Sequence, residues 1–142
     1  MAVDSSATAT WEGDLATGQG TARPASGTFP ELTMTWHRRA LSRDTGTSPE
    51  ELIAAAHASC FSMALAHGLA TAGFPPQHLD TSARVTFAGG DGITAIHLTA
   101  KGKVPGIDAA VFTAAVEDAK ANCPVSKALA AVPITAEATL VL

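Results

Sequence analysis

The order of apolar and polar positions predicts strands at both ends of the chain and helices between them. In "ELTMTWHRR" polar and apolar residues alternate, as they do in a half-buried strand, and "AGGDG" is a turn that suits a hairpin. Six segments share these strand signals: 7–13, 20–24, 31–39, 80–87, 92–104 and 134–142. We therefore expect three early strands, a hairpin in the middle of the chain and a closing strand.

A long helix is predicted by its start signal. Ser48 is suited to the N-cap, Pro49 to the first helical position, and Glu51 completes an S-x-x-E capping box. The helix is expected to run to Gly73, because glycine is the usual stop at a helix C-terminus.

A second helix is expected to start at Asp108, a good N-cap, and to end near the sequence Cys123-Pro124. Its apolar face would consist of Val111, Phe112, Ala115, Val116 and Ala119. A short helix over 125–132 should follow.

The long helix carries no charged side chain between residues 52 and 74, so a membrane span has to be weighed. Histidine, serine, threonine and glycine interrupt the run, and alanine contributes little hydrophobicity, so the pattern disfavours a membrane helix. A helix that is apolar on all sides is expected instead to be central and surrounded by other elements. The result is an α+β fold with strands packed against a buried helix.

Composition agrees with a single packed domain over residues 1–142, with 46% hydrophobic and 15% charged residues. Thirty of the residues are alanine, so the core is thin, which favours an oligomer. The net charge of −4 argues against a nucleic-acid partner. The N-terminus has no signal-peptide pattern, and two cysteines are too few for a secreted disulfide scaffold, so a cytoplasmic location is expected.

Cys60 lies in the middle of the long helix, and Cys123 lies much later in the chain, at the junction of two helices. Either could be a packing residue, because free cysteine is among the most buried residue types. Cys123 has a further possibility, since backbone N–H groups at the start of the short helix could stabilise a thiolate.

A reactive Cys60 faces an electrostatic problem. Burial raises the pKa of a thiol, and the helix dipole acts only within the terminal turns. The thiolate would therefore need a cation from elsewhere in the chain or from a partner. Arginine suits because it stays charged when desolvated, and the candidates are Arg38, Arg39 and Arg43, at the end of the strand before the helix.

A metal site is the other specific possibility. His57 and Cys60 are three residues apart on one helical face, and Cys123 could be a third ligand, but the sequence offers no evident fourth. His67 lies too far along the helix to join them. We favour the interpretation that His57 and His67 are partly buried histidines bonded to backbone, and we expect no metal.

The segments "TSPEELIAAAHASCFSMAL" and "KANCPVSKAL", in this order and well separated along the chain, resemble the OsmC/Ohr family of thiol-dependent peroxidases. "TWEGDLATGQGT" and "VPGIDAAVF" resemble its OsmC branch, so the likeness spans nearly the whole chain. The resemblance implies an OsmC-like α+β fold, with antiparallel sheets wrapped around buried central helices in an intertwined homodimer.

The resemblance also implies site residues. Cys60 matches the cysteine that reacts with peroxide, Cys123 the resolving cysteine, and Glu50 the glutamate of the P-E-E/Q segment. "TWHRR" matches a W/F-x-x-R segment and places the arginine at Arg39, with Arg38 as the choice if the loop slips by one residue. The expected partners are a hydroperoxide, a dithiol reductant such as a lipoyl-type thiol, and a second copy of the chain. No cofactor or membrane is expected.

The expected chemistry follows from these roles. Arg39 would hold Cys60 as a thiolate while Glu50 fixes the guanidinium. Attack on the O–O bond would release an alcohol and leave a sulfenic acid, which Cys123 would convert to a disulfide that an external dithiol resets. The uncharged surroundings of Cys60, including Phe61 and Met63, favour organic hydroperoxides.

The spacing within the long helix constrains how such a site is assembled. Glu50 and Cys60 are ten residues apart, or about 15 Å along a continuous helix. Either the helix breaks after its first turn, or an Arg39–Glu50 pair serves Cys60 of a partner subunit. We favour the shared site.

Two other functions use the same residues. A ligand-binding or redox-sensing protein could have this fold with thiols that oxidise without efficient turnover. A structural protein stabilised by zinc would bind metal tightly and lose stability with a chelator. A cysteine pair together with an arginine and a glutamate favours the enzyme.

Overall fold

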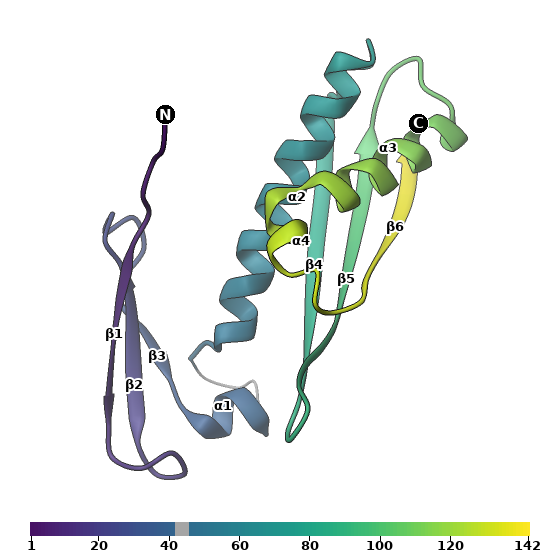
Figure 1. Ribbon diagram of the computed structural model, residues 1–142. Coiled ribbons are helices and arrows are strands. Elements are labelled where there is room, and N and C mark those ends of the chain that lie inside the picture. Colours follow the sequence, from purple (N-terminus) through teal and green to yellow (C-terminus); the bar gives the residue numbers. More distant parts are fainter. Residues whose placement is uncertain (42–45) are drawn as a thin grey trace. The chain divides into compact units, whose positions relative to one another are not determined.

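Three antiparallel strands and a short helix form the N-terminal part of the computed structural model, which describes residues 1–41 and 46–142 (Figure 1). The described chain divides into two compact units, Met1–Pro49 and Glu50–Leu142. The expectation of a single domain over 1–142 stays a prediction. The elements of the first unit are β1 (Ala7–Glu12), β2 (Gln19–Pro24), β3 (Leu32–Met34) and α1 (Trp36–Ala40).

The first unit confirms the early strands and corrects the third. Strand β3 stops at Met34, and the residues expected to continue it form α1 instead. The reason is local, because the side chain of Thr35 accepts a hydrogen bond from the backbone N–H of Arg38 and caps the helix. Arg38 and Arg39 therefore lie on a helix and not at a strand end, while Arg43 is outside the described residues.

The second unit combines a three-stranded sheet with helices. The sheet order is β4-β5-β6, and β4 pairs with β5 in an antiparallel hairpin as expected. Strand β6 runs parallel to β5, so this sheet is mixed and the expectation of antiparallel sheets is wrong here. Two helices carry the chain back between β5 and β6, as a parallel connection requires. The elements are α2 (Pro49–Thr71), β4 (His78–Ala88), β5 (Gly92–Lys103), α3 (Ala109–Asn122), α4 (Pro124–Ala128) and β6 (Ile134–Val141).

Helix α2 begins and ends where the sequence predicts. It starts at Pro49 and is continuous to Thr71. At its end Gly73 has a φ of 89°, its N–H donates to the carbonyl of Ala70 at 3.0 Å, and the N–H of Phe74 donates to the carbonyl of Leu69 at 2.8 Å. This is a Schellman motif, in which glycine adopts the left-handed conformation that other residues avoid.

The core of the second unit lies between the sheet and the helices. α2 runs along β4, and α3 crosses the sheet (Figure 1). Thr81 of β4 donates its hydroxyl to the carbonyl of Ala58 at 3.2 Å and ties the strand to α2. Fully buried side chains come from α2, β5 and α3: Phe61, Leu65, Ile96, Leu98, Phe112 and Val116. The expected face of α3 is confirmed except for Val111, which is 43% exposed.

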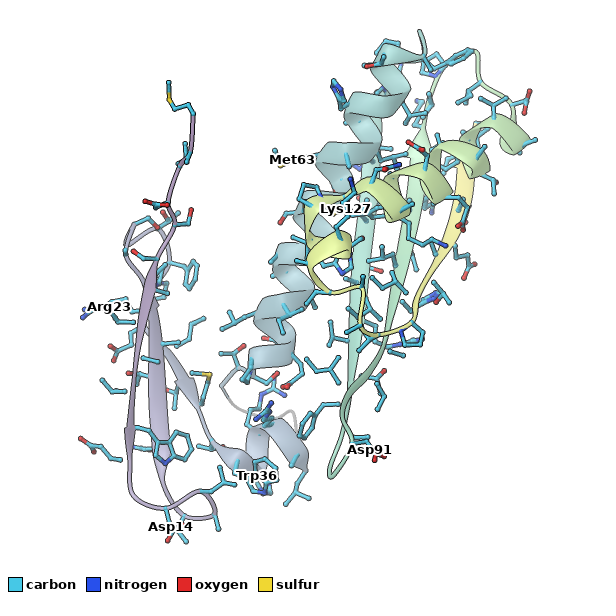
Figure 2. All side chains as sticks on the ribbon, in the orientation of Figure 1. Asp14, Arg23, Trp36, Met63, Asp91 and Lys127 are labelled. Atoms are coloured by element: carbon cyan, nitrogen blue, oxygen red, sulfur yellow. The ribbon has the colours of Figure 1, made fainter. Side chains whose placement is uncertain are left out.

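Only one face of α2 is buried, which differs from the expectation of a helix covered on all sides. Met63 projects from the outer face (Figure 2) and is 74% exposed. By length and composition α2 could cross a membrane. Its packing argues for a core helix, because Phe61, Leu65 and Leu69 belong to the core of the second unit.

Candidate active site

The two cysteines are far apart in sequence, and they meet in the second unit. Cys60 is on the inner side of α2 and is half-buried, while Cys123 is the residue between α3 and α4 and is fully buried. Both thiols are free, and they lie close enough that a hydrogen bond between them raises the pKa of Cys60 and lowers that of Cys123. The structure therefore brings together the two sulfurs that a disulfide would join.

The surroundings favour the negative charge on Cys123. Burial raises the pKa of Cys60, the neighbouring Cys123 raises it further, and the N–H of Val125 offsets only part of this. Burial alone would also raise the pKa of Cys123. Hydrogen bonds from the Cys60 thiol, from the backbone N–H groups of Ser126 and Val125 and from the Ser126 hydroxyl outweigh it, so the pKa of Cys123 is lowered.

The pKa shifts of Cys60 and Cys123 can be compared with what the sequence predicted for each thiol. The predicted role of backbone N–H groups in favouring a Cys123 thiolate is supported. The predicted cost of burying Cys60 is also found, and nothing in the second unit that shifts its pKa is a cation. A Cys60 thiolate therefore needs positive charge from outside its immediate surroundings.

His57 contributes a polar contact that the sequence did not reveal. It is fully buried one turn before Cys60, and its Nε2 lies 2.7 Å from the Ser126 hydroxyl. The expectation that His57 and His67 are partly buried and bonded to backbone is wrong for both, because His57 binds a side chain and His67 is exposed. Ser126 was missed altogether; its signal was a hydroxyl three residues after Cys123, on the same face of a short helix.

The zinc alternative finds no support among residues 1–41 and 46–142. Within that part of the chain no three histidine, cysteine or acidic side chains are grouped closely enough to hold a metal ion. His57, Cys60 and Cys123 are instead linked through thiol and hydroxyl hydrogen bonds.

The predicted arginines lie in the first unit. Arg38 is only 9% exposed, and its Nε donates to the carbonyl of Gly46 at 2.8 Å. Arg39 borders an apolar hollow of about 230 Å³, whose other lining residues are Trp11, Leu15, Met34, Thr35, Trp36 and Pro49. The two neighbouring arginines thus have different surroundings.

Glu50 is in the first turn of α2 and is 3% exposed. Because α2 is continuous between Glu50 and Cys60, the alternative of a helix that breaks after its first turn is excluded. The two residues are ten positions apart, about 15 Å along the axis. The structure therefore brings Cys60 and Cys123 together and keeps Glu50 of the same helix at a distance.

Known proteins share both the sequence and the fold of this chain. The sequence pattern of the family "OsmC-like protein" matches residues 42–137. "Peroxiredoxin OsmC" of Escherichia coli (strain K12) is 44% identical over 134 residues, which cover 92% of this chain and 93% of the relative.

Solved structures agree. An OsmC-like protein from Mycoplasma pneumoniae has a TM-score of 0.73 at 17% identity, covering 100% of both chains. The organic hydroperoxide resistance protein OhrB of Bacillus subtilis has a TM-score of 0.64 at 25% identity, covering 96% of this chain and 98% of OhrB. Together with the contact between the two thiols, these likenesses assign the chain: it belongs to the OsmC-like family and is a cysteine-based peroxidase.

Proposed function

We propose that this chain reduces organic hydroperoxides to alcohols, with Cys60 as the attacking sulfur and Cys123 as the resolving sulfur. The observation that carries the assignment of residues is the hydrogen bond between the two thiols. Of the pair, Cys60 is the one that a substrate reaches, because it is half-buried while Cys123 is fully buried.

The proposed reaction uses two thiols for each peroxide. The Cys60 thiolate attacks one peroxide oxygen, the O–O bond breaks, and the leaving alkoxide takes up a proton to become the alcohol. Cys60 is then a sulfenic acid. Cys123 attacks that sulfur, an S–S bond forms, and hydroxide leaves as water after taking up the second proton. An external dithiol, for example a lipoyl-type thiol, reduces the disulfide and is itself oxidised.

The cation that Cys60 needs is proposed to be Arg39, held by Glu50. Arg39 borders a hollow at the surface of its unit, where another element can reach it, whereas the Nε of Arg38 is bound to a carbonyl inside its own unit. A guanidinium paired with Glu50 would lie about three helical turns from Cys60 of the same α2. We therefore infer that the Arg39–Glu50 pair serves Cys60 of a second subunit.

A homodimer would also cover surfaces that the single chain leaves bare. All six residues of β1 are exposed, and a three-stranded sheet with one fully exposed strand buries little apolar area. Beyond Glu51 the outer face of α2 is uncharged, and it carries the exposed Met63. Both features support an assembly in which two copies share their sites.

The preference for organic hydroperoxides rests on the likeness to the organic hydroperoxide resistance protein OhrB of Bacillus subtilis and on the uncharged surface of α2 beyond Glu51. Phe61 cannot contribute to it, because this side chain is fully buried in the core. Met63, three residues after Cys60 on α2, would contact an apolar substrate group at the site that the two subunits share. A cytoplasmic location and a role in oxidative and osmotic stress defence complete the proposal.

Peroxide consumption by the reduced protein with a dithiol tests the function. The wild-type protein should turn over repeatedly and Cys60→Ser should be inactive. Without added dithiol, Cys123→Ser should consume about one equivalent of peroxide and leave Cys60 as a sulfenic acid, where the wild type forms a disulfide. Ser59→Ala is the matched control, because Ser59 is exposed on α2 and its hydroxyl donates only to helix carbonyls. Equal rates for wild type and Cys60→Ser would refute the proposal.

A further inference from the structure

His57 and Ser126 form a buried hydrogen bond beside the two cysteines of the second unit. The Nε2 atom of His57 is 2.7 Å from Ser126 Oγ, and hydrogen bonds from the Cys60 thiol and the Ser126 hydroxyl both lower the pKa of Cys123. His57 and Ser126 are 0% and 4% exposed, so water does not replace these contacts. The proposed reaction gives roles to the two sulfurs only and leaves the other two residues unexplained.

The number of protons available determines which group donates each of these hydrogen bonds. A thiolate accepts hydrogen bonds and a serine hydroxyl has one proton, so a Ser126 hydroxyl that donates to Cys123 must accept its other bond. That bond can come only from an N–H at Nε2 of His57. The other ring nitrogen, Nδ1, then carries a lone pair, and it is buried without a partner.

The same geometry keeps His57 neutral. A proton added at Nδ1 would find no acceptor, and burial lowers the pKa of His57. The ring is therefore a fixed neutral donor near neutral pH. Its effect on Cys123 is to orient the hydroxyl of Ser126 and not to add a positive charge.

Two lysines line the same hollow as Ser126. A hollow of about 270 Å³ reaches this residue and is lined by Lys120 of α3 and Lys127 of α4, the second of which Figure 2 labels. Lys120 is paired with Glu117. The strand residues that share the core with Cys123 are apolar.

We propose that His57 is a positioning residue which, by holding the Ser126 hydroxyl toward Cys123 Sγ, makes Cys123 the sulfur that leaves when the disulfide is reduced. This inference rests on the proposed function, because it assumes the Cys60–Cys123 disulfide. The thiolate of the external dithiol attacks Cys60 Sγ, the S–S bond breaks, and its electron pair stays on Cys123. The dithiol's second sulfur then attacks the first, releasing Cys60.

The first test measures the thiolate of Cys123 by its ultraviolet absorbance as pH is varied, in a Cys60→Ser background. Adding Ser126→Ala or His57→Leu should reduce the fraction of thiolate at neutral pH about fivefold, the effect expected from one lost hydrogen bond. His57→Gln should retain most of it, because its side-chain N–H can still donate to Ser126.

Two controls separate positioning from general disturbance of the fold. His67→Leu changes an exposed histidine on the same helix, and Ser59→Ala removes a hydroxyl that bonds only α2 carbonyls, so neither should move the titration. If His57→Leu does not fold, Ser126→Ala decides the question. A folded Ser126→Ala protein with an unchanged titration would overturn the proposal.

The second test locates the mixed disulfide. The protein is oxidised with a thiol oxidant, reacted briefly with a monothiol, quenched and mapped by mass spectrometry. The adduct should be on Cys60 in the wild type and on both cysteines in Ser126→Ala. An adduct mainly on Cys123 in the wild type would contradict the inference. Neither test needs peroxide, so a failure of peroxidase activity would leave both results readable.

Discussion

The separation of Glu50 from Cys60 along α2 gives a quantitative reason to expect a site shared between subunits. With about 15 Å between the residues and an effective dielectric constant near 20, a positive charge held at Glu50 would stabilise the thiolate by about 1 kcal/mol, compared with about 4 kcal/mol at about 4 Å. Salt reduces the first value further. A same-chain Arg39–Glu50 pair is therefore too weak to activate Cys60.

The perturbation is a mixed dimer of one Cys60→Ser chain and one Arg39→Ala chain, purified through two different tags. The Cys60→Ser homodimer should be inactive because it has no attacking thiol. The Arg39→Ala homodimer should be nearly inactive, because losing an adjacent cation lowers the thiolate fraction about 10- to 1000-fold. In the mixed dimer, one site combines Cys60 of the second chain with Arg39 of the first. We expect about half the wild-type rate of peroxide consumption.

The assay is steady-state consumption of an organic hydroperoxide with excess dithiol, with both homodimers as references. The Arg38→Ala homodimer tests the choice of arginine. It should keep most of its activity if Arg39 is the cation. A mixed dimer as inactive as its parents would refute the shared site. It would mean that each chain activates its own thiol.

Three further predictions concern stability and pH. Asp108→Ala should lower the free energy of unfolding by about 1 kcal/mol in urea titrations, because it removes the cap of α3. Gly102→Ala should cost about 1–3 kcal/mol, since its Cβ would lie 2.6 Å from the buried ring of Phe112, while Gly89→Ala meets nothing within 4 Å and should be nearly neutral. Burial lowers the pKa of His57 from its ordinary 6.5, so the unfolded chain binds its proton first as pH falls; Tm should drop below about pH 6.5, and less steeply in His57→Gln.

Much of the fold could be predicted because its signals are local. Pro49 suits the start of α2 because its fixed φ is helical and its missing N–H has no partner to lose there. Gly73 ends α2, and Asp108 starts α3, through bonds to nearby backbone groups. The helix α1 was missed because the side chain of Thr35 caps it within a stretch whose alternation is typical of a strand. The parallel pairing of β6 depends on the path of the whole chain, which alternation within one strand does not record.

The site was predictable only in part. The resemblance to the OsmC/Ohr family implied reactive thiols at Cys60 and Cys123, whereas position alone left packing open. Burial of Cys60 was expected to disfavour its thiolate, and the structure confirms that burial raises its pKa. The bond between His57 and Ser126 joins residues 69 positions apart, so no pattern within either segment reveals it. On sequence alone His57 indicated a metal ligand or a backbone contact, because its partner is fixed by tertiary packing.

The contact between Cys60 and Cys123 also has a consequence for the unfolded chain. A bond between these sulfurs would close a long loop that includes β4, β5 and α3. Chain-entropy arguments give such a cross-link about 4 kcal/mol of stabilisation. In each catalytic cycle the protein would thus alternate between a disulfide form, which resists unfolding and proteolysis, and a less stable dithiol form. The redox state of the pair would then influence how long the protein survives as well as how fast it works.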